Sequence, residues 1–185
     1  FAITRKWGWK YPKQVDALLG SLIESTISFL SLQASAGADE LMLFDSWASA
    51  VTAAQRDWLV TRPAQVIIEG LRKNGHQQPV IGFPKGIGEG LIAYVDQSGV
   101  DAVGLDHGVD PVWVDCNLPQ YFPVQGNLDP LSLLQAGPEM FRDIDHILDA
   151  FANRPHIFNL GHGITPPTPT ENVQLMLDHV RRHQG

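Results

Sequence analysis

Cysteine and charge are scarce in this 185-residue chain, and each scarcity excludes a class of protein. The single cysteine, Cys116, cannot form a disulfide within the chain, which favours a reducing compartment. Charged residues make up 18% of the sequence and apolar residues 44%, whereas disordered proteins combine high charge with low hydrophobicity. The net charge of −7 gives no indication that the chain binds nucleic acid or an anionic membrane.

Long hydrophobic runs are also missing. The uninterrupted apolar stretches fall far short of the ~20 residues that a membrane-spanning helix needs. No basic segment followed by an apolar one opens the chain, so the sequence predicts no signal peptide. We therefore expect a cytoplasmic protein. Because the first residue is Phe1 and not methionine, we also expect residues 1–185 to be a single partial domain of a longer chain.

Five short apolar runs are present, and segments with helical periodicity separate them. Near-continuous apolar runs of this length are typical of strands buried on both faces of a parallel sheet. The helical segments include an apolar stripe from Val15 to Leu30, a stretch near 53–73 that Pro63 should end or kink, and a last helix after Thr168. The predicted strands lie near 41–45, 80–84, 102–106, 122–126 and 156–160.

This alternation predicts an α/β fold with a parallel sheet whose strands follow chain order. At about 37 residues per unit, eight units would take about 300 residues, close to the ~250 of a (β/α)8 barrel. We therefore expect the C-terminal portion, about five βα units, of a (β/α)8 TIM barrel. An open Rossmann sheet is the second choice, because the glycines at Gly86, Gly88 and Gly90 lack the spacing of its phosphate-binding turn.

Polar residues follow the predicted strands, at the end where barrel enzymes place their active sites. His162 lies between two glycines, so its imidazole can approach a ligand and donate to a carboxylate, or it can be a loop histidine bonded to a carbonyl. Asp45 and Ser46 can face the site or begin a helix, and Asp129 can likewise cap the helix that starts at Pro130. The polar positions at the strand ends are Asp45, Ser46, Lys85, Asp106, His107, Asn127, Asp129 and His162.

A serine-hydrolase motif and a zinc motif are poorly matched. The run Asp-Ser-Trp-Ala-Ser after the first strand lacks the Gly-x-Ser-x-Gly turn of serine hydrolases. His179 and His183 are four residues apart, but no glutamate follows His179 and both lie in a last helical turn that favours cations, so we predict no metal site. Cys116 lies in a helical segment and is expected to pack in the core.

A glycosidase remains compatible with the carboxylates at the strand ends. Asp45, Asp106 and Asp129 offer the pair of acids that glycoside hydrolysis requires, and barrels are a common home for that chemistry. The spacing of these residues along the chain does not determine the distance between their carboxyl groups. This alternative therefore stays open.

Taken together, the segments at the strand ends resemble the uroporphyrinogen decarboxylase family. The resemblance covers essentially the whole chain, and its most specific part is Gln-Gly-Asn-Leu-Asp-Pro followed by Asn-Leu-Gly-His-Gly. The matching segments occur in the family's order and at suitable spacing. They are 43–47 (LFDSW), 82–86 (GFPKG), 103–106 (VGLD), 125–130 (QGNLDP) and 159–164 (NLGHGI).

The resemblance implies a (β/α)8 barrel, usually a homodimer, that uses neither a cofactor nor a metal. Such enzymes convert the four acetate side chains of uroporphyrinogen III to methyl groups, giving coproporphyrinogen III. It also implies that Ser46 and His162 bind carboxylate side chains of this tetrapyrrole. The family's arginine-rich loop, pyrrole-binding aspartate and active-site tyrosine precede the position of Phe1. Catalytic residues are therefore expected outside this chain, which by itself should be inactive.

Two further readings remain. A methyltransferase of the same superfamily, acting with a corrinoid or folate partner, would hold zinc with histidine and cysteine at strand ends, and Cys116 lies away from them. The other reading is a non-catalytic half-barrel.

A substrate with eight carboxylates calls for arginine, whereas Lys85 is the obvious cation among the strand-end positions. That scarcity agrees with an arginine-rich segment outside the chain.

Overall fold

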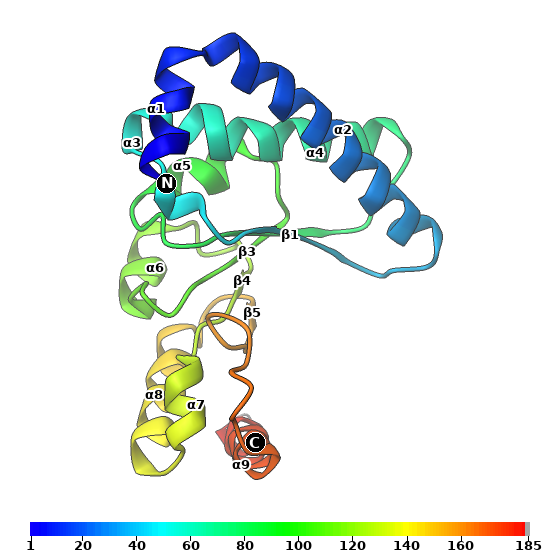
Figure 1. Ribbon diagram of the computed structural model, residues 1–185. Helices are drawn as coiled ribbons and strands as arrows, with labels where there is room; N and C mark the ends of the chain where they lie inside the picture. The colour runs from blue at the N-terminus through cyan, green and yellow to red at the C-terminus, as the bar shows by residue number, and fades with distance from the viewer. Residues whose placement is uncertain (184–185) are drawn as a thin grey trace. The chain divides into compact units, whose positions relative to one another are not determined.

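A computed structural model describes residues 1–183 (Figure 1). The chain divides into two compact units, Phe1–Ala102 and Val103–Gly185. The five strands follow one another in chain order, β1-β2-β3-β4-β5, and the pairings inside each unit are parallel. The predicted α/β class with a sequential parallel sheet is therefore confirmed.

The first unit packs helices on a parallel pair of strands. Strand β1 (Leu41–Asp45) pairs with β2 (Val80–Pro84), and both coincide with the predicted runs. Gly82 lets helix α5 close on the sheet, because a Cβ there would lie 2.5 Å from the hydroxyl oxygen of Tyr94. In Figure 1, α2 and α4 run side by side over β1. The helices are α1 (Ala2–Lys10), α2 (Pro12–Ser35), η1 (Ala48–Ala50), α3 (Ala53–Arg56), η2 (Asp57–Thr61), α4 (Arg62–Lys73) and α5 (Gly90–Gln97).

Pro63 disrupts the helical stretch as predicted. The α-helical hydrogen bonding of α3 gives way to the π-helical turn η2, and regular α-helix resumes at Arg62, with Pro63 in the first turn of α4. A proline ring has no N–H and clashes with the carbonyl four residues earlier. The wider π-helical turn η2 lies directly before the ring and relieves that clash.

Helix α2 differs from its prediction in two ways. The stripe from Val15 to Leu30 is not one buried face, because Val15 and Leu30 are buried while Leu18 and Leu22 are 46% and 54% exposed. Among residues 1–183, α2 also passes a length and hydropathy test for a membrane span. The short uninterrupted runs did not reveal this property, because the apolar residues of α2 are spread among serines and threonines; a core helix can have the same length and composition.

In the part of the second unit that the structure describes, up to residue 183, there are three short parallel strands and four helices. Strands β3 (Ala102–Gly104), β4 (Val124–Gln125) and β5 (His156–Ile157) pair in that order, and a bridge between Leu128 and Leu160 continues the last pairing. These strands are shorter than predicted. β4 is limited on both sides, because Pro123 before it has no N–H to donate and Gly126 after it leaves the extended conformation with a φ of +131°. The helices are α6 (Pro111–Asn117), α7 (Pro130–Gln135), α8 (Pro138–Ala150) and α9 (Thr170–His183).

Cys116 is exposed, so the expectation that it packs in the core was wrong. Val114 and Leu118, four residues apart, take the buried side of α6 and the residues that follow it. Cys116 lies midway between them in the sequence and therefore points away from the core.

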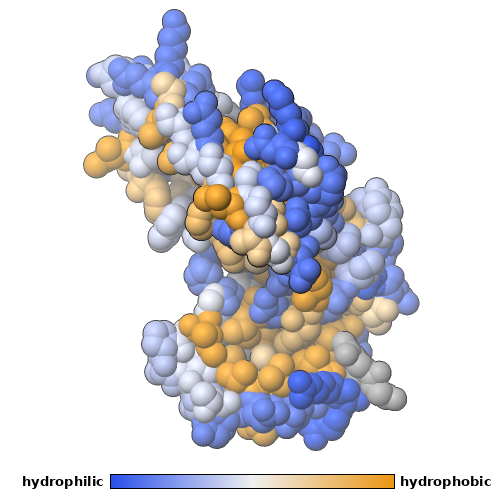
Figure 2. Space-filling view, turned by 90° about the vertical axis from the view of Figure 1, so that its right-hand side faces the viewer, coloured by the Kyte–Doolittle hydropathy of each residue, from blue (hydrophilic) through white to orange (hydrophobic). Residues whose placement is uncertain are grey.

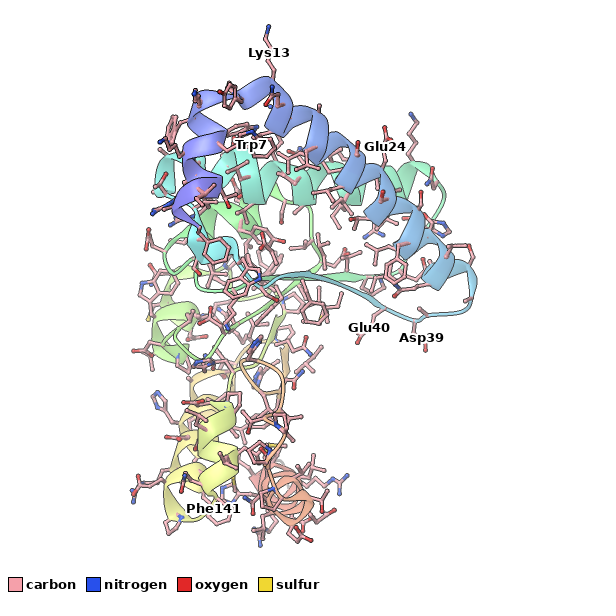
Figure 3. The ribbon with its side chains drawn as sticks, viewed as in Figure 1. Trp7, Lys13, Glu24, Asp39, Glu40 and Phe141 are labelled. Carbon is pink, nitrogen blue, oxygen red and sulfur yellow. The ribbon has the colours of Figure 1, made fainter. Side chains whose placement is uncertain are left out.

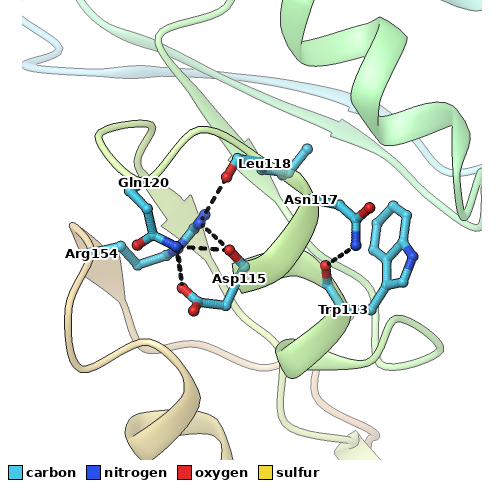
Figure 4. Close-up of polar contacts among 6 residues, drawn as sticks. All are labelled: Trp113, Asp115, Asn117, Leu118, Gln120 and Arg154. Carbon is cyan, nitrogen blue, oxygen red and sulfur yellow. Dashed lines mark hydrogen bonds and ion pairs between the residues drawn. The ribbon is translucent and has the colours of Figure 1, made fainter.

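A buried arginine joins α6 to the turn between α8 and β5 (Figure 4). The side chain of Arg154 is 0% exposed, and its Nε donates to Asp115 Oδ1 at 3.0 Å. Its Nη2 donates to the carbonyl of Leu118 at 3.1 Å and to that of Asp115 at 3.4 Å. These bonds satisfy carbonyls near the end of α6, which a helix C-terminus otherwise leaves unpaired.

Apolar surface remains on the second unit. Ile157 of β5 is 45% exposed, and Ile164 and Leu175 are 52% and 46% exposed. Figure 2 shows hydrophobic surface gathered over part of this unit, in the lower half of the view. β5 is also the last strand in the strand order.

Candidate functional site

The loops after β3 and β5 touch through a glycine. The backbone of Gly161 packs against the backbone of Asp106 and His107, so closely that an added Cβ would overlap His107 N and lie 2.9 Å from Asp106 C. Gly161 N–H also donates to the carbonyl of Leu128 at 2.8 Å. This glycine therefore makes a close approach to protein backbone, where we had expected a ligand. His162 follows directly and is exposed.

Asn127 ties the loop after β4 to the loop after β3. Its side-chain Nδ2 donates to the carbonyls of Asp106 at 2.9 Å and Val109 at 2.8 Å, and the residue is 4% exposed. Among the described residues, Oδ1 of Asn127 is buried without a protein partner. Asn127 thus holds two loops together, and its amide nitrogen is already used by protein carbonyls.

The two acids of this region have local structural roles. Asp129 caps α7, since its Oδ1 accepts from Leu131 N at 2.9 Å, as the capping alternative predicted. Asp106 is 8% exposed and its Oδ1 accepts from Gly108 N at 2.9 Å. These bonds give the carboxylate of Asp106 a turn role and that of Asp129 a cap role.

His156 is a residue that the sequence analysis missed. Its Nε2 lies 2.6 Å from the carbonyl oxygen of Gly126, so the neutral ring donates a hydrogen bond to the turn that carries Asn127. Burial lowers the pKa of His156; the bond to Gly126 opposes this effect, and the nearby Arg154 adds to it. The only signal in the sequence was a polar residue at the start of a predicted strand.

Asp45, Ser46 and Lys85 lie where the strands of the first unit end. Lys85 N donates to the carbonyl of Asp45 at 3.0 Å, which continues the pairing of β1 with β2. Asp45 Oδ1 accepts from Trp47 N at 3.2 Å, so the carboxylate closes a turn at the strand end and caps no α-helix. Burial raises the pKa of Asp45, although the Trp47 bond opposes it. Ser46 is half-buried.

An apolar pocket of about 260 Å³ lies beside Asp45 in the first unit. Residues of helices α1 and α2 supply half of its lining, and Trp47 closes one side with its ring 4.9 Å from that of Phe1. A second pocket of about 200 Å³ in the second unit is more polar, with His107 and Asn127 among its lining. Each unit thus has a hollow next to its strand ends.

The histidine pair at the end of α9 binds carboxylates of α8. His179 Nε2 lies 2.6 Å from Asp145 Oδ1, and its ring stacks on Phe141, which Figure 3 labels, with centroids 4.6 Å apart. His183 Nε2 lies 3.3 Å from Asp149 Oδ1. No group of three or more His, Cys, Asp or Glu side chains within residues 1–183 is arranged to hold a metal ion.

The predicted site residues thus fall into two groups. Asp106, His107 and Asn127 are brought together with Gly161, and hence with the start of the His162 loop, in the second unit. Asp45, Ser46 and Lys85 lie together in the first unit. A cleft shared by Ser46 and His162 stays a prediction.

Comparison with known proteins gives one consistent family. The profile described as "Uroporphyrinogen decarboxylase (URO-D)" matches residues 1–183. The uroporphyrinogen decarboxylase of Novosphingobium aromaticivorans is 47% identical over 178 residues, which are 96% of this chain and 52% of that protein. The one from Sphingopyxis alaskensis is 46% identical over 180 residues, 97% of this chain and 53% of that protein. The chain therefore spans about half the length of these relatives.

A solved structure supports the fold. A methyltransferase from Methanosarcina mazei superimposes with a TM-score of 0.82 over 97% of this chain and 52% of its own, at 18% sequence identity. At that identity the likeness concerns the fold alone.

Proposed function

Since this chain belongs to the uroporphyrinogen decarboxylase family, we propose that it forms part of an enzyme that decarboxylates uroporphyrinogen III to coproporphyrinogen III. The observation that carries this proposal is the family match over residues 1–183, together with 47% identity to a protein of that name. The chain would be the C-terminal portion, a single partial domain, of a (β/α)8 barrel that works as a cytoplasmic homodimer.

In each of the four steps, an acetate side chain loses CO₂ and gains one proton to become a methyl group. No cofactor is needed if the pyrrole takes up the electrons: protonation of the ring creates a cation, the C–CO₂ bond breaks, and its electron pair neutralises that cation. The resulting exocyclic carbon is then protonated as the ring proton leaves. The carboxylate that stabilises the cation would lie outside this chain.

Ser46 and His162 would bind carboxylates of the substrate. Each directly follows, or lies within a few residues of, the carboxyl end of a strand, where a barrel places its active site. Ser46 offers a hydroxyl donor and His162 an exposed imidazole, and both suit a carboxylate acceptor. Neither is proposed as the acid or as the electron sink.

The methyltransferase reading is the runner-up, and the fold shared with the Methanosarcina mazei neighbour is compatible with it. Cys116 argues against a zinc site of histidine and cysteine, because it lies on α6 and is the single cysteine of the chain. Metal analysis of the purified chain separates the two readings: one zinc per chain that depends on Cys116 would favour the methyltransferase.

A chimera tests the proposed function. Residues 1–185 replace the matching segment of the Novosphingobium aromaticivorans relative, and the product is assayed anaerobically with uroporphyrinogen III. We expect decarboxylation by the chimera and none by residues 1–185 alone. His162→Ala should raise KM and reduce turnover without abolishing it, because the imidazole binds carboxylate and does not hold the pyrrole cation.

The control for that variant is His76→Ala, in the loop that enters β2 at its amino end. It should leave the kinetics unchanged. Complete loss of turnover in a folded His162→Ala chimera would contradict a binding role. Substantial activity of residues 1–185 alone would contradict the need for a further segment.

A further inference from the structure

His156 of β5 lies on the buried face of the second unit's strands. It is the register partner of Val124 on β4, and Gln125 is the partner of Ile157. Partners on neighbouring strands point to the same face of a sheet, and successive residues of one strand alternate between the two faces. Val124 is 0% exposed, whereas Ile157 is 45% exposed. The side chain of His156 therefore shares the face of Val124 and not that of Ile157.

The imidazole of His156 is fixed by one hydrogen bond and by aromatic packing. Its Nε2 lies 2.6 Å from the carbonyl oxygen of Gly126. A carbonyl can only accept, so the neutral ring donates from Nε2. The ring centroid lies 4.7 Å from that of Phe151, at the end of α8, and 6.2 Å from that of Phe158. This packing limits rotation of the ring and keeps the donor directed at Gly126.

Gly126 is the first residue after β4, and its carbonyl depends on the bond from His156. Gly126 N donates to Ile157 O at 3.0 Å, which continues the pairing of β4 with β5. Among residues 1–183, no backbone N–H donates to the carbonyl of Gly126. The position also favours glycine, because its φ is +131° and a Cβ would lie 2.7 Å from the carbonyl oxygen of Leu105. His156 thus binds a carbonyl that the strand pairing leaves without a donor.

The next residue of this turn, Asn127, holds the loop after β3. Its Nδ2 donates to the carbonyls of Asp106 at 2.9 Å and Val109 at 2.8 Å. The carbonyl of Gly126 and the backbone nitrogen of Asn127 belong to one planar peptide group. A displacement of that carbonyl therefore moves Asn127 as well and disturbs both of its side-chain bonds.

Leu128 joins the same turn to the loop that carries His162. Its N–H donates to Asn159 O at 3.1 Å, and its carbonyl accepts from Gly161 N at 2.8 Å. His162 directly follows Gly161 and is exposed. The position of the His162 backbone is thus tied to the turn at 126–128 by two backbone hydrogen bonds.

We propose that His156 is a positioning residue of the site that binds substrate carboxylates. Its hydrogen bond to Gly126 fixes the turn at 126–128, and the bonds of Leu128 in that turn set the place of His162. This inference rests on the proposed function for the role of His162. His156 itself would not touch the substrate, because it lies on the buried face of the strands.

A merely structural role for His156 leads to a different expectation, and His179 provides the comparison. Its Nε2 lies 2.6 Å from Asp145 Oδ1, and its ring stacks on Phe141. Both histidines thus make a bond of the same length and an aromatic contact in the second unit, but the bond of His179 joins α9 to α8. Loss of either bond should lower stability, whereas loss of the His156 bond alone should change substrate binding.

The test uses the chimera described above, with uroporphyrinogen III as the substrate. His156→Phe keeps an aromatic ring and removes the donor. It should raise KM about three- to tenfold, the loss expected for one neutral hydrogen bond, with a smaller change in kcat. His156→Gln should bring KM back to within about twofold of the unchanged chimera, because its amide nitrogen can donate in place of Nε2. The matched control, His179→Phe, should leave KM unchanged.

A second measurement does not depend on turnover. The chimera is prepared with isotope-labelled histidine, and the ring signal of His162 is assigned from its absence in His162→Ala. His156→Phe should shift this signal, His156→Gln should return it, and His179→Phe should leave it in place. If His156→Phe does not fold, His156→Met takes its place, because an unbranched methionine fills irregular space and offers no donor.

The proposal is overturned if the folded His156→Phe chimera keeps the KM of the unchanged one, or if His179→Phe raises KM as much. It is also overturned if His156→Gln is as impaired as His156→Phe, or if the ring signal of His162 does not move. An inactive chimera whose His162 signal responds to His156→Phe and not to His179→Phe would contradict the proposed function and leave the positioning role standing.

Discussion

Replacing Arg154 by methionine should destabilise the second unit by about 2–3 kcal/mol. Breaking a buried ion pair usually costs about 3–5 kcal/mol, because the remaining charge stays buried. Here the side chain of Asp115 is 31% exposed, so water can solvate its carboxylate once the arginine is gone. Arg154 Nη1 is also buried with no hydrogen-bond partner among residues 1–183, a cost that the substitution removes. Both effects place the loss below the usual range.

The loss that remains comes from two carbonyls. Asp115 O and Leu118 O accept from the guanidinium at the end of α6, and methionine offers them no donor. A hydrogen bond to a charged group contributes about 1.5–3 kcal/mol. Arg154→Lys keeps the charge beside Asp115 but cannot reach both carbonyls with a planar fork, so it should lose about half as much.

The free energy of unfolding of the second unit is measured by urea titration. Hydrogen exchange of the β3 and β4 amides, recorded at each urea concentration, reports the unfolding of this unit. The matched control is Arg142→Met, which removes an ion pair with Glu139 whose side chains are 65% and 78% exposed. That variant should change the free energy of unfolding by less than about 0.5 kcal/mol. The reasoning fails if Arg154→Met costs under about 1 kcal/mol, or if the two variants cost the same.

Two other predictions concern the strand-end loops of the second unit. Gly161→Ala should displace the backbone of His107 or Gly161 itself, visible as amide chemical-shift changes in both loops, whereas Gly163→Ala, which meets open space, should not. Because burial lowers the pKa of His156, the unfolded chain takes up a proton at higher pH than the folded one. Stability of this unit should therefore fall as the pH drops below about 6.5, and His156→Gln should lose that part of the pH dependence.

The strands of the first unit could be predicted from the sequence alone. Their apolar runs were predicted to form strands near 41–45 and 80–84, and the structure places β1 at Leu41–Asp45 and β2 at Val80–Pro84. The effect of Pro63 was equally local, since a proline acts on the carbonyl four residues before it. Period and sterics within a few residues decide such features.

The faces of the helices depended on tertiary packing. Apolar spacing shows that Leu18 and Leu30 both lie on apolar sides of α2, but only the folded unit shows that Leu30 is buried and Leu18 is not. Cys116 was misplaced for the same reason, because an apolar residue in a helix can face either side until its neighbours Val114 and Leu118 are located.

The candidate site divides in the same way. The sequence was enough to select Ser46 and His162 as site candidates, because both are polar residues that follow a predicted strand. It also predicted that Asp129 could cap the next helix, as it does. What Asn127, Gly161 and Arg154 do could not be predicted, because their partners are far along the chain: Asn127 bonds Asp106, Gly161 rests on His107, and Arg154 bonds Asp115. No local periodicity encodes which distant carbonyl a buried donor will reach. That choice is made when the strands and helices pack and every buried polar group needs a partner.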